Sequence, residues 1–192
     1  MSHSKPLPRP STPFVKPPAK PAVKTADVGV VVAHPGQHLH LLAGQLYFGN
    51  TAARVHTLLG SCVAVTLWNP TRRLGGMCHF LLPSRHRPPG SGRDGRFGNE
   101  SLEMLVEAIL KAGTRPQDYQ VNLYGGADTL PDMNGHKFNV GERNIEQGWT
   151  LIDHYGFVLQ DVDVGDHVPR NVSMTFHDGQ VQMRREIGRA HV

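Results

Sequence analysis

The sequence predicts an α+β fold, a mixed β-sandwich with helices packed on its outside. Two observations lead to this prediction. Short apolar segments with the two-residue alternation of β-strands occur in both halves of the chain, and two longer segments repeat their apolar residues at the helical period. Clusters of strands, helices and further strands follow one another along the chain, an order that favours a sandwich carrying helices on its surface.

The clearest predicted element is a hairpin. Val63, Val65 and Leu67 alternate with their neighbours as in a strand, residues 69–73 have turn chemistry, and residues 74–82 form a second, more buried strand. Strands joined by so short a loop pair in antiparallel fashion, so the start of the first lies beside the end of the second. The hairpin therefore places Cys62 close to His79.

Two helices and four more strands complete the prediction. Residues 99–112 form an amphipathic helix capped by Asn99 and ended by Gly113. A second helix covers residues 142–155 and ends at Gly156. The remaining strands are expected at residues 120–124, 157–162, 171–176 and 181–184, the last two joined by a turn at residues 178–179.

Cys62 is the residue with the strongest chemical signal. A cysteine at a strand mouth beside a histidine can become a nucleophile, because the imidazole favours removal of the thiol proton. Gly60 and Ser61 have little bulk, which lets a substrate carbonyl approach the amides near Ser61 and Cys62 as oxyanion donors. The alternative is structural: a small buried cysteine and a hydrogen-bonded interior histidine.

Several motifs follow one another along the chain, at residues 57–65 (TLLGSCVAV), 75–83 (GGMCHFLLP), 124–127 (YGGA), 139–145 (NVGERNI), 160–165 (QDVDVG) and 170–176 (RNVSMTF). The first two carry the cysteine and the histidine. In sequence and in order, these motifs closely resemble those of the CheD family of chemoreceptor glutamine deamidases. The resemblance covers most of the chain after about residue 41 and implies the same sandwich fold.

The resemblance also implies catalytic roles. Cys62 matches the family's catalytic cysteine, His79 its histidine, and Thr57 its threonine, which would orient the imidazole. His56 lies next to Thr57 in the sequence. The chain departs from the family pattern at Cys78, which stands where a small or amide residue is usual, and at residues 165–169, which replace a glycine-pair turn.

The implied activity is that of a protein-glutamine glutaminase, which converts glutamine side chains of methyl-accepting chemotaxis receptors to glutamate with release of ammonia. The implied partners are the receptor's cytoplasmic coiled coil and a CheC-type phosphatase. Two other functions stay open from the residues: a non-catalytic chemotaxis adaptor, and a cysteine hydrolase or transglutaminase-like enzyme with another amide substrate. No cofactor is expected.

The net charge of +4 raises the question of nucleic-acid binding, but much of the positive charge falls in two segments of loop-like composition. One is the proline-rich N-terminus. The other is the glycine- and proline-rich loop after the hairpin, whose arginines could steer an acidic receptor helix toward Cys62 or could belong to a mobile linker. These arginines are Arg85, Arg87, Arg93 and Arg96. We therefore expect no nucleic-acid partner.

Composition sets the remaining expectations. The chain has 192 residues, 39% of them hydrophobic, and no apolar run approaching the roughly 18 residues of a membrane span. Two cysteines without a secretory signal favour a reducing, cytoplasmic location. His34, His38 and His40 lack a neighbouring carboxylate or thiol, so no metal site is expected. The predicted boundaries are a flexible tail and lead-in over residues 1–40, a catalytic domain over 41–185, and a candidate non-native tail over 186–192.

Overall fold

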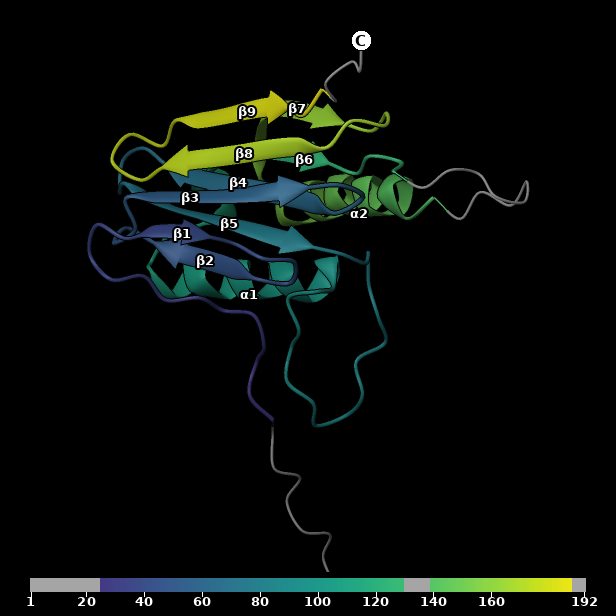
Figure 1. Ribbon diagram of the computed structural model, residues 1–192. Helices are drawn as coiled ribbons and strands as arrows, with labels where there is room; N and C mark the ends of the chain where they lie inside the picture. The colour runs from purple at the N-terminus through teal and green to yellow at the C-terminus, as the bar shows by residue number, and fades with distance from the viewer. Residues whose placement is uncertain (1–24, 130–138, 188–192) are drawn as a thin grey trace, which may run out of the picture.

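The computed structural model describes residues 25–129 and 139–187, which form two stacked β-sheets and a layer of helices (Figure 1). One sheet has five strands in the order β2–β5–β4–β6–β7 and the other has four in the order β1–β3–β8–β9. The five-stranded sheet consists of β2 (Leu46–Gly49), β5 (Leu74–Phe80), β4 (Val63–Asn69), β6 (Gln120–Gly125) and β7 (Val158–Val164). The four-stranded sheet consists of β1 (His38–His40), β3 (Arg54–Leu59), β8 (Arg170–Thr175) and β9 (Val181–Arg185).

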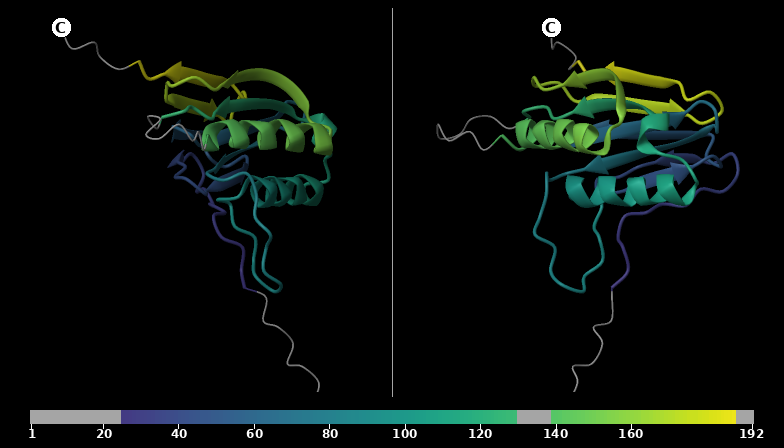
Figure 2. Two further views of the ribbon diagram at one scale, coloured as in Figure 1. Left: turned by 90° about the vertical axis from the view of Figure 1, so that its right-hand side faces the viewer. Right: turned by 180° about the vertical axis from the view of Figure 1, so that it is seen from behind.

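The helices cover only one face of the five-stranded sheet (Figure 2). They are α1 (Gly98–Lys111) and α2 (Val140–Tyr155), and a short 3-10 turn, η1 (Pro116–Asp118), precedes β6. The pairs β1–β3 and β6–β7 are parallel and the other strand pairs are antiparallel. The predicted α+β class, a mixed β-sandwich with outer helices, is confirmed.

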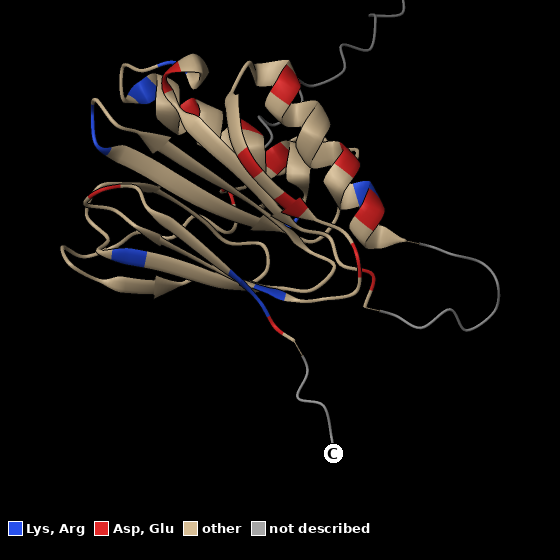
Figure 3. Ribbon diagram, turned by 90° about the horizontal axis from the view of Figure 1, so that it is seen from above, with Lys and Arg blue, Asp and Glu red and all other residues tan. Residues whose placement is uncertain are grey.

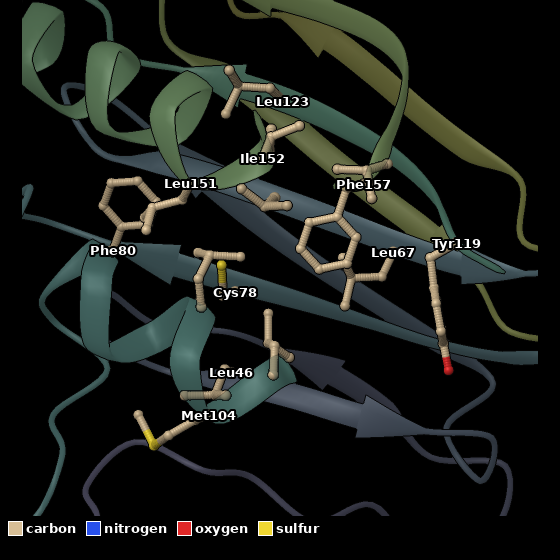
Figure 4. Close-up of a cluster of buried hydrophobic side chains, with 14 of the residues drawn as sticks. Leu46, Leu67, Cys78, Phe80, Met104, Tyr119, Leu123, Leu151, Ile152 and Phe157 are labelled. Atoms are coloured by element: carbon tan, nitrogen blue, oxygen red, sulfur yellow. The ribbon is translucent and has the colours of Figure 1, made fainter. Parts of the chain in front are cut away.

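Two separate apolar cores hold these three layers together. One lies between the five-stranded sheet and the helices and includes Leu67, Met104 and Ile152 (Figure 4). The other lies between the two sheets and includes Val55, Met77 and other buried residues of both sheets. Because alternate residues of a strand point to opposite faces, β2, β4, β5 and β6 contribute side chains to both cores.

The predicted hairpin is confirmed: β4 and β5 are antiparallel, with Ala64 paired with His79. Both predicted helices are confirmed within two residues. The predicted cap at Asn99 is wrong, because α1 begins one residue earlier, at Gly98, and its N-cap is Phe97. The loop before α1 is fixed by backbone bonds between Leu82 and residues 96–98, which start the helix without a side-chain cap.

The sequence analysis did not predict three short strands, β1, β2 and β3. In β3 the buried positions are Val55, Thr57 and Leu59, so the alternation is present, but a threonine among them weakens the apolar signal. In the described part of the predicted lead-in, His38–His40 forms β1 beside β3 and Val30 bridges to Leu46. Most of the two predicted tails, residues 1–24 and 188–192, lies outside the described residues.

Candidate active site

Thr57 and His79 meet across the space between the two sheets. Thr57 comes from β3 of the four-stranded sheet and His79 from β5 of the five-stranded sheet, and both side chains are buried. Thr57 Oγ1 lies 2.7 Å from His79 Nδ1 and also 2.7 Å from the carbonyl oxygen of Leu41. A hydrogen-bonded relay thus runs from the backbone at Leu41 through Thr57 to the imidazole.

The relay fixes the tautomer of His79. A carbonyl oxygen can only accept, so the single hydroxyl proton of Thr57 is donated to Leu41. The Thr57 oxygen must then accept from the Nδ1–H of His79, which leaves Nε2 as the unprotonated nitrogen of the neutral ring. An imidazole held in this way is oriented to act as a general base through Nε2.

Nε2 of His79 is buried and has no hydrogen-bond partner. Burial, with a smaller contribution from the charge of His40, lowers the pKa of the His79 imidazole to about 4. The ring is therefore neutral near pH 7 and its Nε2 lone pair is free to take a proton.

Cys62 lies just before β4 and is partly exposed. It packs against the core between the sheets, as does Met77, two residues before His79 on β5. Since Ala64 pairs with His79, Cys62 is a diagonal neighbour of His79 on the same sheet face. Burial raises the pKa of the Cys62 thiol, so the resting pair is a neutral thiol and a neutral imidazole, not yet hydrogen-bonded to each other.

The turn that carries Cys62 is anchored through its carbonyl groups. The carbonyl oxygen of Gly60 accepts from the Ala127 N–H at 3.0 Å, and that of Cys62 accepts from the Gly126 N–H at 2.8 Å. The carbonyl oxygen of Ser61 accepts from the Asn144 side chain at 3.1 Å. In a planar trans peptide the N–H points opposite to the carbonyl, so the Ser61 and Cys62 amides are directed away from these anchors.

Glycine is required where β6 ends against this turn. Gly125 and Gly126 have φ angles of 108° and 69°, in the region that favours glycine. A Cβ at Gly125 would lie 2.3 Å from the Cys62 carbonyl oxygen, and one at Gly126 would lie 2.4 Å from the Ile145 side chain. The motif at residues 124–127 thus lets β6 and α2 close on the Cys62 turn.

Cys78 does not belong to this site. It lies on β5 next to His79 but packs into the core beneath the helices (Figure 4). Cys62 packs on the opposite face of the sheet. It is fully buried, and burial raises the pKa of its thiol to about 11. A bridge between the two cysteines would have to cross the sheet.

The four arginines proposed for steering are all paired with carboxylates. Glu100 accepts two hydrogen bonds from Arg85, at 2.7 and 2.9 Å, and Arg96 pairs with Asp94 at 2.7 Å. The other two, Arg87 and Arg93, form ion pairs with acidic residues of α1 and, for Arg93, also with the N-terminal segment. Acidic positions gather along the helix layer in Figure 3. The pairs of Arg85, Arg87 and Arg93 fasten the loop to α1, and the Arg96–Asp94 pair lies within the loop.

The structure also places residues that the sequence did not single out. Leu41 and Asn144 complete the site, the first through its carbonyl oxygen and the second through its amide. His56, next to Thr57, turns to the outer face of β3 and its ring lies 4.4 Å from that of His40. In residues 25–129 and 139–187, no group of three or more His, Cys, Asp or Glu side chains could hold a metal ion. None of the described helices is long and apolar enough to cross a membrane.

Comparison with known proteins identifies the family. The family described as CheD chemotactic sensory transduction matches residues 81–185. The probable chemoreceptor glutamine deamidase CheD 3 of Dechloromonas aromatica is 41% identical over 138 residues, 72% of this chain and 81% of the relative. The probable chemoreceptor glutamine deamidase CheD of Pseudomonas syringae pv. tomato is 38% identical over 149 residues, 76% of this chain and 88% of the relative.

A third relative aligns over more of the chain. The probable chemoreceptor glutamine deamidase CheD 1 of Chromobacterium violaceum is 35% identical over 171 residues, 88% of this chain and 84% of the relative. The family match begins at residue 81 and therefore does not include Cys62 or His79. Their proposed roles depend on their sequence motifs and on the geometry described above. Together, these matches show that the chain belongs to the CheD family.

Proposed function

We propose that this protein is a chemoreceptor glutamine deamidase in which Cys62 is the nucleophile, His79 the general base and Thr57 the residue that orients it. The observation that carries the proposal is the relay from Leu41 through Thr57 to His79, which leaves Nε2 unprotonated on the sheet face shared with Cys62. The relatives described above carry the name chemoreceptor glutamine deamidase, which supports this choice of substrate.

The first half of the reaction forms a thioester. As the thiol turns toward Nε2, His79 takes its proton and the sulfur attacks the carboxamide carbon of a glutamine side chain. The developing oxyanion accepts hydrogen bonds from the Ser61 and Cys62 amides. When the tetrahedral intermediate collapses, the imidazolium gives its proton to the nitrogen and ammonia leaves.

The second half regenerates the enzyme. Nε2 of His79 takes a proton from water, the hydroxide attacks the thioester carbon, and the same amides stabilise the oxyanion. The sulfur then leaves and recovers the proton. The sum is glutamine plus water giving glutamate plus ammonia, and Thr57 keeps accepting from Nδ1–H throughout.

Each turnover replaces a neutral amide with a carboxylate. On a helical coiled coil, such a charge changes the free energy of helix packing by a few tenths of a kcal/mol for each charged side-chain pair. A change of this size is enough to bias a receptor whose two states are closely balanced. We include the cytoplasmic coiled coil of the receptor as substrate, a CheC-type phosphatase as partner and a cytoplasmic location in the proposal.

The test is incubation of the full chain with a receptor cytoplasmic fragment in water carrying a heavy oxygen isotope. Deamidation predicts one heavy oxygen per modified glutamine, located by peptide mass spectrometry, together with released ammonia. Cys62→Ala and His79→Ala should abolish both while keeping receptor binding. Binding without modification by the unsubstituted chain would indicate an adaptor, and attachment of an added amine would indicate transglutamination. Either result would overturn the proposal.

A further inference from the structure

Asn144 joins the two segments that carry the proposed nucleophile and base. Its side-chain Nδ2 donates to the carbonyl oxygen of Ser61 at 3.1 Å and to that of Leu81 at 2.8 Å. Ser61 directly precedes Cys62, and Leu81 follows His79 by two residues. Asn144 is fully buried in the second turn of α2, so water does not compete for these bonds.

The orientation of the Asn144 amide follows from its partners. Both are carbonyl oxygens, which only accept, so the atom between them must be the NH2 nitrogen. The other atom, Oδ1, is buried without a hydrogen-bond partner. An unpaired buried oxygen is unfavourable, and an apolar side chain would avoid it. The contribution of Asn144 therefore lies in the two bonds that its nitrogen donates.

The bond to Ser61 acts on the peptide unit between Ser61 and Cys62. That unit is planar and trans, so fixing its carbonyl oxygen also fixes the direction of the Cys62 N–H on the opposite side. The bond to Leu81 fixes the end of β5, the strand that carries His79, to the same nitrogen. One buried amide thus sets the Cys62 N–H and the β5 end relative to each other.

The helix that carries Asn144 is itself held against the site. A Cβ on Gly141, one turn earlier, would lie 2.4 Å from the Gly126 carbonyl oxygen, so α2 and the end of β6 are in direct backbone contact. Asn139 caps the helix by accepting from the Glu142 N–H at 3.0 Å. This close packing limits movement of Asn144 relative to the Cys62 turn.

We propose that Asn144 is a positioning residue, which holds the Ser61–Cys62 peptide so that the Cys62 N–H is ready to stabilise the oxyanion. This inference rests on the proposed deamidase function. Removing the anchor should slow the chemical step and leave substrate binding and the nucleophilicity of the thiol largely unchanged, because neither of these needs an oxyanion donor.

The experiment compares Asn144→Ala with Leu151→Ala in the full chain, at a temperature well below either melting point. Leu151 lies on the same helix and is also buried, but it packs into the core away from the turn. We expect Asn144→Ala to lower kcat about a hundredfold with KM little changed, the size of effect seen for one oxyanion-hole donor. Leu151→Ala should lower the melting temperature and keep kcat.

A second measurement separates the oxyanion role from damage to the thiol. Alkylation of Cys62 by iodoacetamide forms no oxyanion, so Asn144→Ala should keep the rate of the unsubstituted chain within about twofold. If Asn144→Ala fails to fold, Asn144→Asp serves instead, because its carboxyl group has the same shape and can donate at most one of the two bonds.

Three results would overturn the inference. One is a kcat for Asn144→Ala that falls no further than that of Leu151→Ala. Another is a parallel loss of kcat and alkylation, which would place the defect at the thiol. The third is an unsubstituted chain that is alkylated normally but does not deamidate, which would reject the proposed function as well, whereas the first two results would leave it standing.

Discussion

Cys62 and Cys78 lie on opposite faces of one sheet and show how position decides the chemistry of a side chain. Cys78 sits in mid-strand beneath two helices, sealed in an apolar core, and its thiol has a pKa of about 11. Cys62 sits at a strand end, partly exposed, on the face that carries the unprotonated nitrogen of His79. Burial raises both pKa values, so the difference lies in access and in the neighbouring base.

The largest expected effect is on activity. Cys62→Ala removes the nucleophile and should reduce deamidation of a receptor fragment by at least about 10⁴-fold, since neither general-base nor oxyanion assistance can replace the covalent step. Cys78→Ala should keep kcat within about threefold and cost about 1–2 kcal/mol of unfolding free energy through the small cavity. Ammonia release and urea titration measure these two quantities. Loss of activity in folded Cys78→Ala would show that Cys78 also contributes to catalysis.

The second prediction concerns reactivity toward alkylating agents. At pH 8, a thiol with a pKa of about 11 is about 0.1% thiolate, and Cys78 is also shielded from solvent. Iodoacetamide should therefore modify Cys62 at least about 10³-fold faster than Cys78 in the folded protein, as measured by peptide mass spectrometry over time. In urea the two rates should converge. Equal rates under folding conditions would contradict the burial of Cys78.

The third prediction is a pH dependence of stability that originates at His79. Its folded pKa of about 4 lies below the unfolded value of 6.5, so the unfolded chain binds a proton that the folded chain excludes. The unfolding free energy should be unaffected by this group above pH 6.5 and should fall by about 3 kcal/mol as the pH drops to 4.

The matched control for this effect is His79→Gln, which cannot titrate. Urea unfolding of both proteins between pH 7.5 and 4 should show the unsubstituted chain losing more stability than His79→Gln, since contributions from other groups cancel in the difference. Parallel curves would mean that the imidazole is not held neutral in the folded protein.

The smallest expected effect sharpens the role of the four-stranded sheet. Thr57→Val keeps the shape of the side chain but removes the acceptor for Nδ1–H. It should lower kcat about a hundredfold, because the imidazole can then rotate and adopt either tautomer. Thr57→Ser should restore most of the rate. His56→Ala, on the outer face of the same strand, should retain it. A larger loss for His56→Ala than for Thr57→Val would reverse the assignment of the third residue.

Local patterns were enough to predict a large part of this fold. The β4–β5 hairpin and both helices follow from periodicity and from short connections, which are properties of neighbouring residues. The hairpin alone brings Cys62 near His79. β1 and β2 were missed because strands of three and four residues offer too few repeats of the two-residue period, and β3 because a threonine stands among its apolar positions.

The α+β class, the hairpin and the family motifs can all be recognised from the order of residues along the chain. The protonation and orientation of His79, in contrast, depend on how the sheets pack. Thr57 reaches His79 because two sheets pack face to face, and the tautomer is set by the carbonyl oxygen of Leu41. Every residue has a carbonyl group, so no residue type can signal this role. Which carbonyl accepts, and which buried amide such as Asn144 anchors the turn, depends on contacts between segments that are distant in the sequence.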